Sequence, residues 1–137
     1  MSAEQNASLV RRYFEECVSP ATGPDKERAL AVADELLTDD FAMFFNNATD
    51  AEATRGRDAH KEFIAGHART FPDDHWTIEA LLADEDSVAC RWHFQSSHAT
   101  GNRIDVRAAD FYGIRDGRLG ELRRFLDFRG LDRQTRA

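Results

Sequence analysis

The stretch that decides the fold is AADFYGIRDGRLGELRRFLDF, residues 108–128, which is typical of two β-strands joined at Asp116-Gly117. An Asp-Gly pair between alternating apolar residues is a strong hairpin signal. A three-residue turn, with Gly117 in the left-handed position, pairs Asp110 with Leu122. A two-residue turn instead pairs Asp110 with Arg123. We favour the three-residue turn because it collects the apolar side chains on one face, and a slip by one residue would turn a whole strand over.

This register places two charged side chains on the apolar face of the hairpin. Asp110 and Arg124 become diagonal neighbours across the two strands, within side-chain reach of each other. Every other charged residue of the hairpin falls on the opposite face or in the turn. A carboxylate and a guanidinium in an otherwise dry interior indicate either a functional site or a structural ion pair.

The hydrophobic pattern has a period of two after residue 75 and a helical period before it. We expect strands over 75–84, 86–99, 102–114 and 118–128, in an antiparallel meander. Upstream, we expect helices over 4–18, 24–37 and 57–71, with one strand over 39–47. Helices followed by a meander indicate an α+β domain with helices on one face of a curved sheet. The length of 137 residues fits a single domain, 1–137.

Composition narrows the function classes. The net charge of −7 argues against a nucleic-acid-binding surface or a basic membrane patch. No stretch reaches the ~20 apolar residues of a membrane span, and the first residues lack a signal-peptide pattern, so we expect a cytoplasmic protein. Cys17 and Cys90 are interpreted as two buried thiols, with a disulfide or a metal site as the alternative.

The chain resembles the SnoaL-like polyketide cyclase family, within the nuclear transport factor 2-like superfamily. The resemblance rests on the order and spacing of LVRRYFEE, DDF, RGRDAHKEF, TFPDDHW, VACRWHF and FYGIRDGRLGELRRFLDFRGLDRQ. It implies a cone-shaped fold, an α+β barrel-like arrangement in which a curved, mixed or antiparallel sheet wraps three N-terminal helices around a deep apolar pocket. It also implies a homodimer through the outer sheet face, where Phe111 and Phe125 are expected.

The resemblance points to known catalytic positions but not to known catalytic residues. Aldol-type cyclases carry a His on the fourth strand and an Asp on the fifth, where this chain has Asp110 and Arg124. The similar ketosteroid isomerases form an oxyanion hole with a Tyr of the first helix and an Asp of the fourth strand, and Tyr13 and Asp110 of this chain match those two. Where those enzymes carry the carboxylate base, this chain has Phe45. The triad of limonene epoxide hydrolase-like members is not reproduced, because Arg124 replaces one of its Asp residues.

Four residues are therefore the candidate catalytic groups. Asp110 is expected to be the acid–base group: desolvation favours its neutral form and a nearby Arg favours its carboxylate. Arg124 and Tyr13 are expected to stabilise an oxyanion, and His67 to be a second proton-transfer group. The alternatives are a buried ion pair for Asp110 with Arg124, a core aromatic for Tyr13, and a core histidine for His67, as also for His60.

The expected pocket lining is mainly aromatic and suits a flat hydrophobic ligand. It comprises Met43, Phe45, Asn46, Phe63, Trp92, Phe94, His98 and Tyr112. For any one of these apolar residues a plain core role is the alternative, and Asn46 could equally form the turn after its strand.

No phosphate loop, dinucleotide fingerprint, metal-ligand set or nucleophile elbow occurs, so we expect no cofactor and no metal. We expect an enzyme that cyclises, isomerises or dehydrates a small hydrophobic, carbonyl-bearing, polyketide-type metabolite. An epoxide hydrolase of the same fold and a non-catalytic ligand-binding or dimerisation module are the alternatives.

Overall fold

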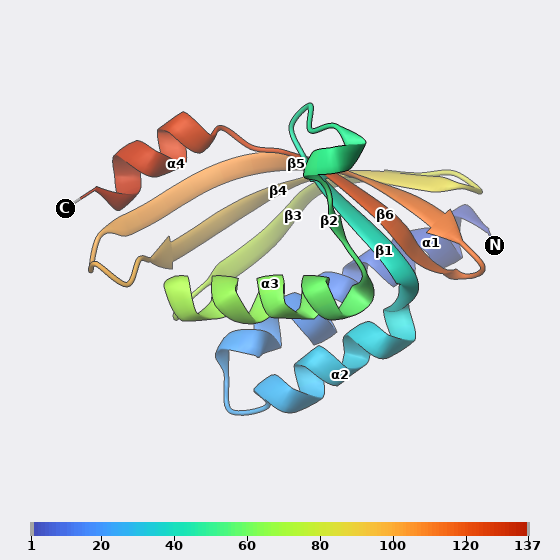
Figure 1. The fold of residues 1–137 in the computed structure, drawn as a ribbon, viewed down its shortest axis with the longest axis horizontal. Helices are drawn as coiled ribbons and strands as arrows, with labels where there is room; N and C mark the ends of the chain where they lie inside the picture. The colour runs from blue at the N-terminus through green and yellow to red at the C-terminus, as the bar shows by residue number, and fades with distance from the viewer. Residues whose placement is uncertain (1, 137) are drawn as a thin grey trace.

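In the computed structural model, which describes residues 2–136, six strands form one strongly curved sheet (Figure 1). The strand order is β2-β1-β6-β5-β4-β3, and β1 runs parallel to β6 whereas the other pairs are antiparallel. The helices are α1 (Ala3–Arg12), α2 (Lys26–Leu36), α3 (Arg57–Thr70) and α4 (Phe128–Thr135). The strands are β1 (Leu37–Phe45), β2 (Thr54–Arg55), β3 (His75–Ala83), β4 (Ser87–Ser97), β5 (Arg103–Arg115) and β6 (Arg118–Phe125).

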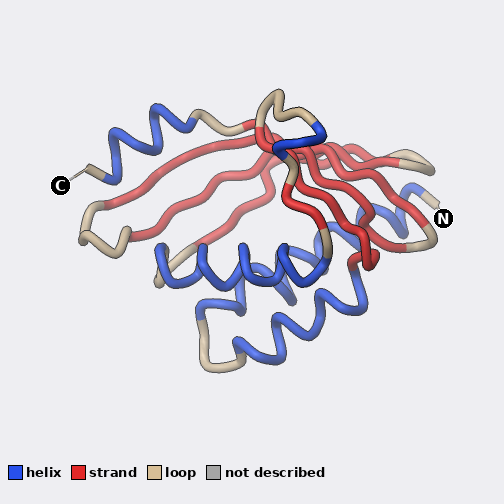
Figure 2. The backbone as a smooth tube through the Cα atoms, viewed as in Figure 1, coloured by secondary structure: helices blue, strands red, loops and turns tan. Residues whose placement is uncertain are grey.

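The helices α1, α2 and α3 lie together on the concave side of the sheet, as Figures 1 and 2 show. Within the described residues the sheet stays open, with β2 and β3 as its edges, rather than closing into a barrel. This arrangement confirms the α+β class, the meander from β3 to β6 and the three helices that precede it. No helix between residues 2 and 136 is long and apolar enough to cross a membrane.

The register of the β5–β6 hairpin differs from the expected one. Arg115 pairs with Arg118, so the turn has two residues, and both Asp116 (φ 53°) and Gly117 (φ 73°) have the positive φ of a type I′ turn. After the pair Ile114–Leu119 the pairing of β5 with β6 shifts by one residue, because Gly120 is an extra residue on β6. This bulge brings Asp110 directly opposite Arg124. The predicted three-residue turn and diagonal pairing are therefore wrong, whereas the shared inward face is confirmed.

The bulge depends on a residue without a side chain. A Cβ on Gly120 would lie 3.3 Å from the Arg115 side chain, a contact closer than most real Cβ atoms make. Bulges add one residue to one strand and increase the local twist. Without the added residue, Asp110 would pair with Arg123. With it, Asp110 pairs with Arg124, and both side chains lie on the inner face of the sheet.

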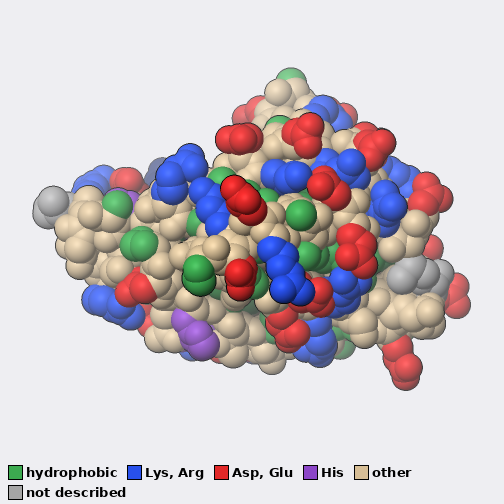
Figure 3. Space-filling view, turned by 90° about the horizontal axis from the view of Figure 1, so that it is seen from below, with side chains coloured by type: hydrophobic (Ala, Val, Ile, Leu, Met, Phe, Trp, Pro, Cys, Tyr) green, Lys and Arg blue, Asp and Glu red, His purple; other side chains and the backbone are tan. Residues whose placement is uncertain are grey.

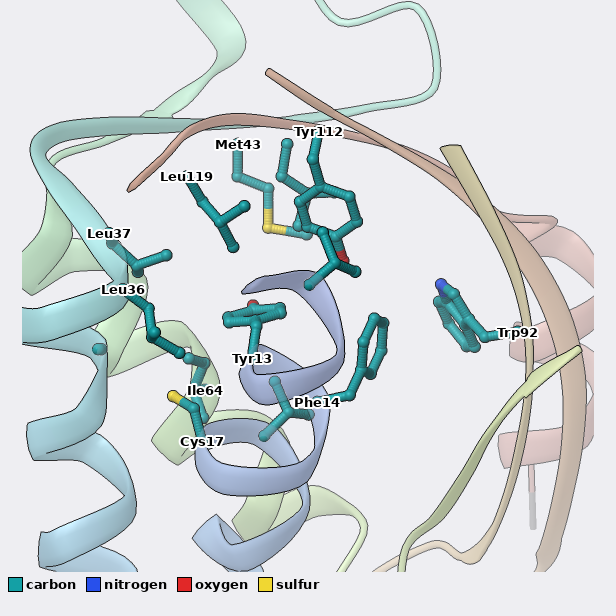
Figure 4. Close-up of a cluster of buried hydrophobic side chains, with 14 of the residues drawn as sticks. Tyr13, Phe14, Cys17, Leu36, Leu37, Met43, Ile64, Trp92, Tyr112 and Leu119 are labelled. Carbon is teal, nitrogen blue, oxygen red and sulfur yellow. The ribbon is translucent and has the colours of Figure 1, made fainter. Parts of the chain in front are cut away.

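The first helix is longer and less regular than expected. After Arg12 the chain continues as a π-helix over Tyr13–Val18 and a 3-10 turn over Ser19–Thr22. The wider π spacing, with the Ser19 N–H donating to the Phe14 carbonyl, is accompanied by burial of four of six side chains in the segment, Tyr13, Phe14, Cys17 and Val18. Figure 4 shows Tyr13 and Phe14 pointing from this segment into the core.

The segment 118–128, expected to be one strand, ends at Phe125 and leads into a helix that the pattern did not indicate. The Asp127 carboxylate accepts from the Gly130 N–H and caps α4. This helix lies away from the other three, beside β5 (Figure 2). There the Gln134 amide both accepts from the Asp105 N–H and donates to the Asp105 carbonyl, which satisfies backbone groups beyond the reach of β6.

The core between the helices and the sheet is densely aromatic. Figure 4 shows Tyr13 beneath Met43 and Leu119, with Tyr112 descending from the sheet. Cys17 and Cys90 are buried free thiols, as expected, and burial raises the pKa of each to about 12. Acidic and basic side chains are intermixed over the helical face (Figure 3), so this face presents no broad area of one charge.

The type I′ turn gives a stability prediction. We expect Gly117→Ala to lower the free energy of unfolding by about 1–2 kcal/mol, because an L side chain is strained at positive φ. Urea titration followed by circular dichroism measures the change. The matched control is Gly66→Ala inside α3, where an added Cβ makes only an ordinary contact at 3.6 Å. It should raise the free energy of unfolding by about 0.5–1 kcal/mol. A neutral Gly117→Ala variant would contradict the turn assignment.

Candidate active site

A buried ion pair on the two central strands anchors the site. The Arg124 Nε donates to Asp110 Oδ1 at 2.8 Å, and its Nη2 donates to Oδ2 at 2.9 Å. The Asp110 side chain is fully buried and that of Arg124 is 5% exposed. Such a bidentate pair fixes the plane of the guanidinium as well as its position. The remaining nitrogen, Nη1, has no hydrogen-bond partner among residues 2–136.

Neighbouring side chains complete the environment of the pair. The Tyr112 hydroxyl donates to Asp110 Oδ2 at 2.6 Å, so the carboxylate accepts three hydrogen bonds. The Arg124 guanidinium lies 4.8 Å from the Trp92 ring centroid and 5.8 Å from that of Trp76. Burial alone would lower the pKa of Arg124, but the Asp110 charge raises that pKa above its usual range. Arg124 is therefore a permanent cation.

Arg124 borders two spaces. The inner space is a void of about 10 Å³, room for about one water molecule. The outer space is a cleft of about 610 Å³ between α3, α4 and the ends of β1 and β6, within the size range of small-molecule sites. Three side chains line both spaces, Phe63, His67 and Arg124. The polar side chains around the inner void are Tyr13, His67, Asp74 and Arg124.

Tyr13 reaches the inner void but is committed to a hydrogen bond. Its hydroxyl lies 2.6 Å from His60 Nε2, and the two rings are stacked. His60 is buried, and desolvation, helped by the Arg124 charge, lowers the pKa of its imidazole to about 3. Burial raises the pKa of the Tyr13 hydroxyl well above its usual range. Both groups therefore stay neutral near pH 7.

His67 lies at the boundary between the void and the cleft. Its ring is surrounded by Phe71, Trp76 and Phe94 at centroid distances of 4.7–5.4 Å. Its imidazole forms no hydrogen bond within residues 2–136. Burial, helped by the Arg124 charge, lowers the pKa of His67 to about 3. The imidazole is therefore neutral near pH 7, and its ring lines both the void and the cleft.

Asp74 is the polar residue of the void that the sequence pattern did not single out. Its carboxylate accepts from the Trp76 Nε1 at 2.7 Å and from the Thr22 hydroxyl at 3.2 Å. Burial raises the pKa of this carboxyl. In the sequence Asp74 belongs to PDD, which is typical of a polar loop between a helix and a strand. Only its position before the inward-facing Trp76 could have indicated its orientation.

The other expected lining residues fall into two groups. Phe45 and Phe63 line the cleft, where Phe128 and Leu131 of α4 join them. Four residues are instead buried in the core and do not line either space, namely Met43, Trp92, Phe94 and Tyr112.

Two polar residues expected in the lining lie in turns. Asn46, at positive φ, accepts from the Leu126 N–H with its side-chain oxygen, and so fastens the end of β1 to β6. The His98 ring is bonded to Thr100 in the β4–β5 turn and packs on Phe71. Asp110 lies behind Arg124 and lines neither the void nor the cleft.

Solved structures with the same fold extend over nearly the whole chain. One described as a SnoaL-like polyketide cyclase from Jannaschia sp. CCS1 has a TM-score of 0.84 at 21% identity and covers 96% of this chain and 92% of its own. One described as an isomerase from Rhodopseudomonas palustris has a TM-score of 0.74 at 23% identity, with coverage of 92% and 94%. One described as a polyketide cyclase from Acidithiobacillus ferrooxidans has a TM-score of 0.73 at 17% identity, with coverage of 95% and 93%.

These similarities define the class of fold, that of the nuclear transport factor 2-like proteins. The sequence profile of the SnoaL-like polyketide cyclases matches residues 8–135. The chain therefore belongs to the SnoaL-like polyketide cyclase family. No curated protein matches it significantly. Among residues 2–136, no group of three or more His, Cys, Asp or Glu side chains is arranged to hold a metal ion.

The two buried imidazoles give a prediction for stability against pH. Their folded pKa of about 3 lies below the unfolded value of about 6.5, so the unfolded chain binds protons first as the pH falls. We expect the free energy of unfolding to decrease from pH 6.5 downward, by up to about 2 kcal/mol per imidazole at pH 5. Urea titrations at pH 7, 6 and 5 measure this slope.

Two substitutions assign the slope to a residue. In His60→Gln the amide can still bond to Tyr13, and about half of the decrease should disappear. The second is His67→Gln, which should remove the other half of the decrease. An equal slope in His60→Gln and the parent protein would show that His60 is not held neutral.

Proposed function

We propose that this protein is a cofactor-independent enzyme of the cyclase and isomerase type, acting on a small hydrophobic, carbonyl-bearing, polyketide-type compound. The observation that carries the proposal is the unpartnered Nη1 of a buried, permanently charged Arg124 at the inner end of an apolar cleft. Removing a proton next to a carbonyl places negative charge on its oxygen. A fixed cation in a water-poor cleft stabilises that charge far more than it would in bulk water.

The geometry supports different roles for the two members of the ion pair. Arg124 borders the ligand space and binds the developing oxyanion. Asp110 is separated from that space, and its oxygens already accept three hydrogen bonds. In this proposal Asp110 is therefore a positioning residue rather than the acid–base group that its sequence position suggests. Tyr13, bonded to His60, shapes the inner wall, and the neutral His67 offers a ring nitrogen to the ligand.

The lining of the cleft supports the proposed substrate class. Most of its lining is apolar, with Phe45, Phe63, Phe71 and Phe128 around it. Such a lining suits flat fused-ring compounds and offers few groups to a sugar or a nucleotide. The inner void has room for about one water molecule, so the rings of a ligand would remain in the cleft and its reactive end would lie at the inner boundary, beside Arg124 and His67.

The test is hydrogen exchange next to a carbonyl, which requires no knowledge of the product. In D₂O the protein should catalyse exchange of the α-protons of 2-tetralone or larger fused-ring ketones, followed by ¹H NMR. We expect Arg124→Lys, which retains the charge beside Asp110 but loses the planar fork, to lower the exchange rate by about 10²–10³-fold. Circular dichroism verifies that the variant is folded.

The adjacent arginine is the matched control for this experiment. Arg123 points to the opposite face of the sheet, over the Phe44 ring, so Arg123→Lys should exchange at the parent rate. Binding of these ketones without exchange would favour a non-catalytic ligand-binding module. Release of a diol from a simple epoxide, without ketone exchange, would favour an epoxide hydrolase.

We also propose a homodimer through the convex face of the sheet. Phe111 and Phe125 are 51% and 39% exposed there, and their rings form an edge-to-face pair with centroids 5.8 Å apart. Exposed aromatic pairs on a sheet face are typical of protein interfaces.

For this interface we expect sedimentation at micromolar concentration to give a dimer for the parent protein. Phe111→Asp should give a folded monomer, because two charges would be buried across a symmetric contact. A parent protein that sediments only as a monomer would contradict the proposed dimer.

A further inference from the structure

We propose that Asp74 is the proton-transfer residue of this site, alternating between carboxylate and carboxylic acid while Thr22 exchanges its hydrogen-bond partner. This inference rests on the proposed function, because it names the group that moves the substrate proton. Asp74 lies immediately before β3, and its side chain lines the inner void together with Arg124. None of the family positions that suggested the other candidates includes it.

Among the polar side chains around the void, Asp74 is the one suited to proton transfer. Arg124 stays charged, and the Tyr13 hydroxyl stays a phenol bonded to His60. The His67 imidazole is so weak a base, with a pKa of about 3, that it holds a proton poorly near neutral pH. Burial raises the pKa of Asp74 above that of an ordinary carboxyl, toward the neutral range where a proton-transfer group is most effective.

The hydrogen bonds around Asp74 fit both of its protonation states. The Thr22 hydroxyl lies 3.2 Å from Asp74 Oδ1 and 3.1 Å from the Ser19 carbonyl, yet it has one hydrogen to donate. When Asp74 is ionised, Thr22 donates to it. When Asp74 is protonated, its O–H donates to the Thr22 oxygen, and Thr22 donates to Ser19. The heavy atoms stay in place, so gaining or losing a proton costs little reorganisation.

The neighbouring carboxylate shows the contrast in environment. Asp73 Oδ1 accepts from the Ser96 hydroxyl and from the backbone and hydroxyl of Ser97, and these bonds lower the pKa of Asp73 to about 2. Its negative charge opposes ionisation of Asp74, whereas His75 and Trp76 favour it. Two adjacent carboxyls thus lie in environments that separate their pKa values, a pattern typical of acid–base sites.

The proposed step balances as an enolisation. A water molecule held in the inner void takes a proton from the carbon next to the substrate carbonyl and passes one of its own protons to Asp74 Oδ1, and the C–H electron pair forms the C=C bond of an enolate. The carbonyl π electrons move to the oxygen, whose charge Arg124 Nη1 binds. The protonated Asp74, held by Thr22 and Trp76, then returns the proton through the same water molecule to a carbon of the enolate. Atoms and charge balance without an added reactant.

The first measurement follows Asp74 directly and does not depend on turnover. ¹³C NMR of the side-chain carboxyls, assigned by Asp74→Asn, should give Asp74 a pKa above the ordinary ~3.9, while Asp73 titrates below that value. In Asp74→Asn the amide can accept from Trp76 and donate to Thr22, which imitates the protonated state. The variant should therefore be at least as stable to urea at pH 7 as the parent protein. An Asp74 pKa at or below ~3.9 would overturn the proposal.

The second measurement is ketone exchange in D₂O. We expect Asp74→Asn to lower kcat about 10²–10⁴-fold with little change in KM, and to remove the acidic limb of the parent pH–rate profile. Asp73→Asn is the matched control: because Asp73 lies outside the void and its charge opposes ionisation of Asp74, this variant should keep the parent rate on the pH plateau and only move the acidic limb to lower pH.

The outcomes separate the two proposals. If the parent protein and Asp74→Asn exchange at similar rates while Arg124→Lys does not, the inference about Asp74 is overturned and the proposed function stands. If the parent protein exchanges no ketone, the proposed function fails, and the role of Asp74 fails with it. A loss of kcat in both Asp74→Asn and Arg124→Lys, with the acidic limb missing only in Asp74→Asn, supports both.

Discussion

The ion pair between Asp110 and Arg124 is the interaction on which the rest of this structure depends. It joins β5 and β6, the two central strands of the sheet, at the point where the helices pack beneath them. Two buried charges are costly to desolvate, and here the cost is offset by two parallel hydrogen bonds and a third from Tyr112. Removing one partner of such a pair leaves an isolated charge, at a cost of about 3–5 kcal/mol. The pair therefore constrains the sheet register, the core and the cleft together.

This constraint also explains why stability and function are hard to separate at this site. Arg124 uses two nitrogens to hold the fold together, its third has no hydrogen-bond partner among residues 2–136, and its side chain lines the cleft. The aromatic wall formed by Trp76 and Trp92 keeps water away from the guanidinium and limits its movement. Most of the other side chains that line the void and the cleft, by contrast, come from the helices and loops that surround the sheet rather than from its strands.

The sequence predicted the elements of the fold well and their exact connection less well. Strand periodicity located the meander and the inward face of Asp110 and Arg124, because alternation depends on each strand alone. The Gly120 bulge was missed, since it depends on how Arg115 packs across the hairpin. Helix α4 was missed because Leu126 and Phe128 continue the apolar alternation of β6 on either side of Asp127, the residue that caps the helix.

The candidate site was predictable only in part, for a related reason. Residue type and strand parity select side chains that point inward, but they do not show which of them meets a cavity. Trp92 and Phe94 point inward and are packed solid, whereas Phe45 borders open space. Asp74 lies in a loop, where no periodicity applies.

The parallel pairing of β1 with β6 has a last consequence, for folding kinetics. Leu37 on β1 pairs with Leu119 on β6, about 80 residues later in the chain. The sheet is therefore complete only when almost the whole chain has been synthesised. Until then β1 has only the short strand β2 beside it, and its other edge stays unpaired, which is the kind of exposed strand edge that makes a nascent chain prone to aggregation.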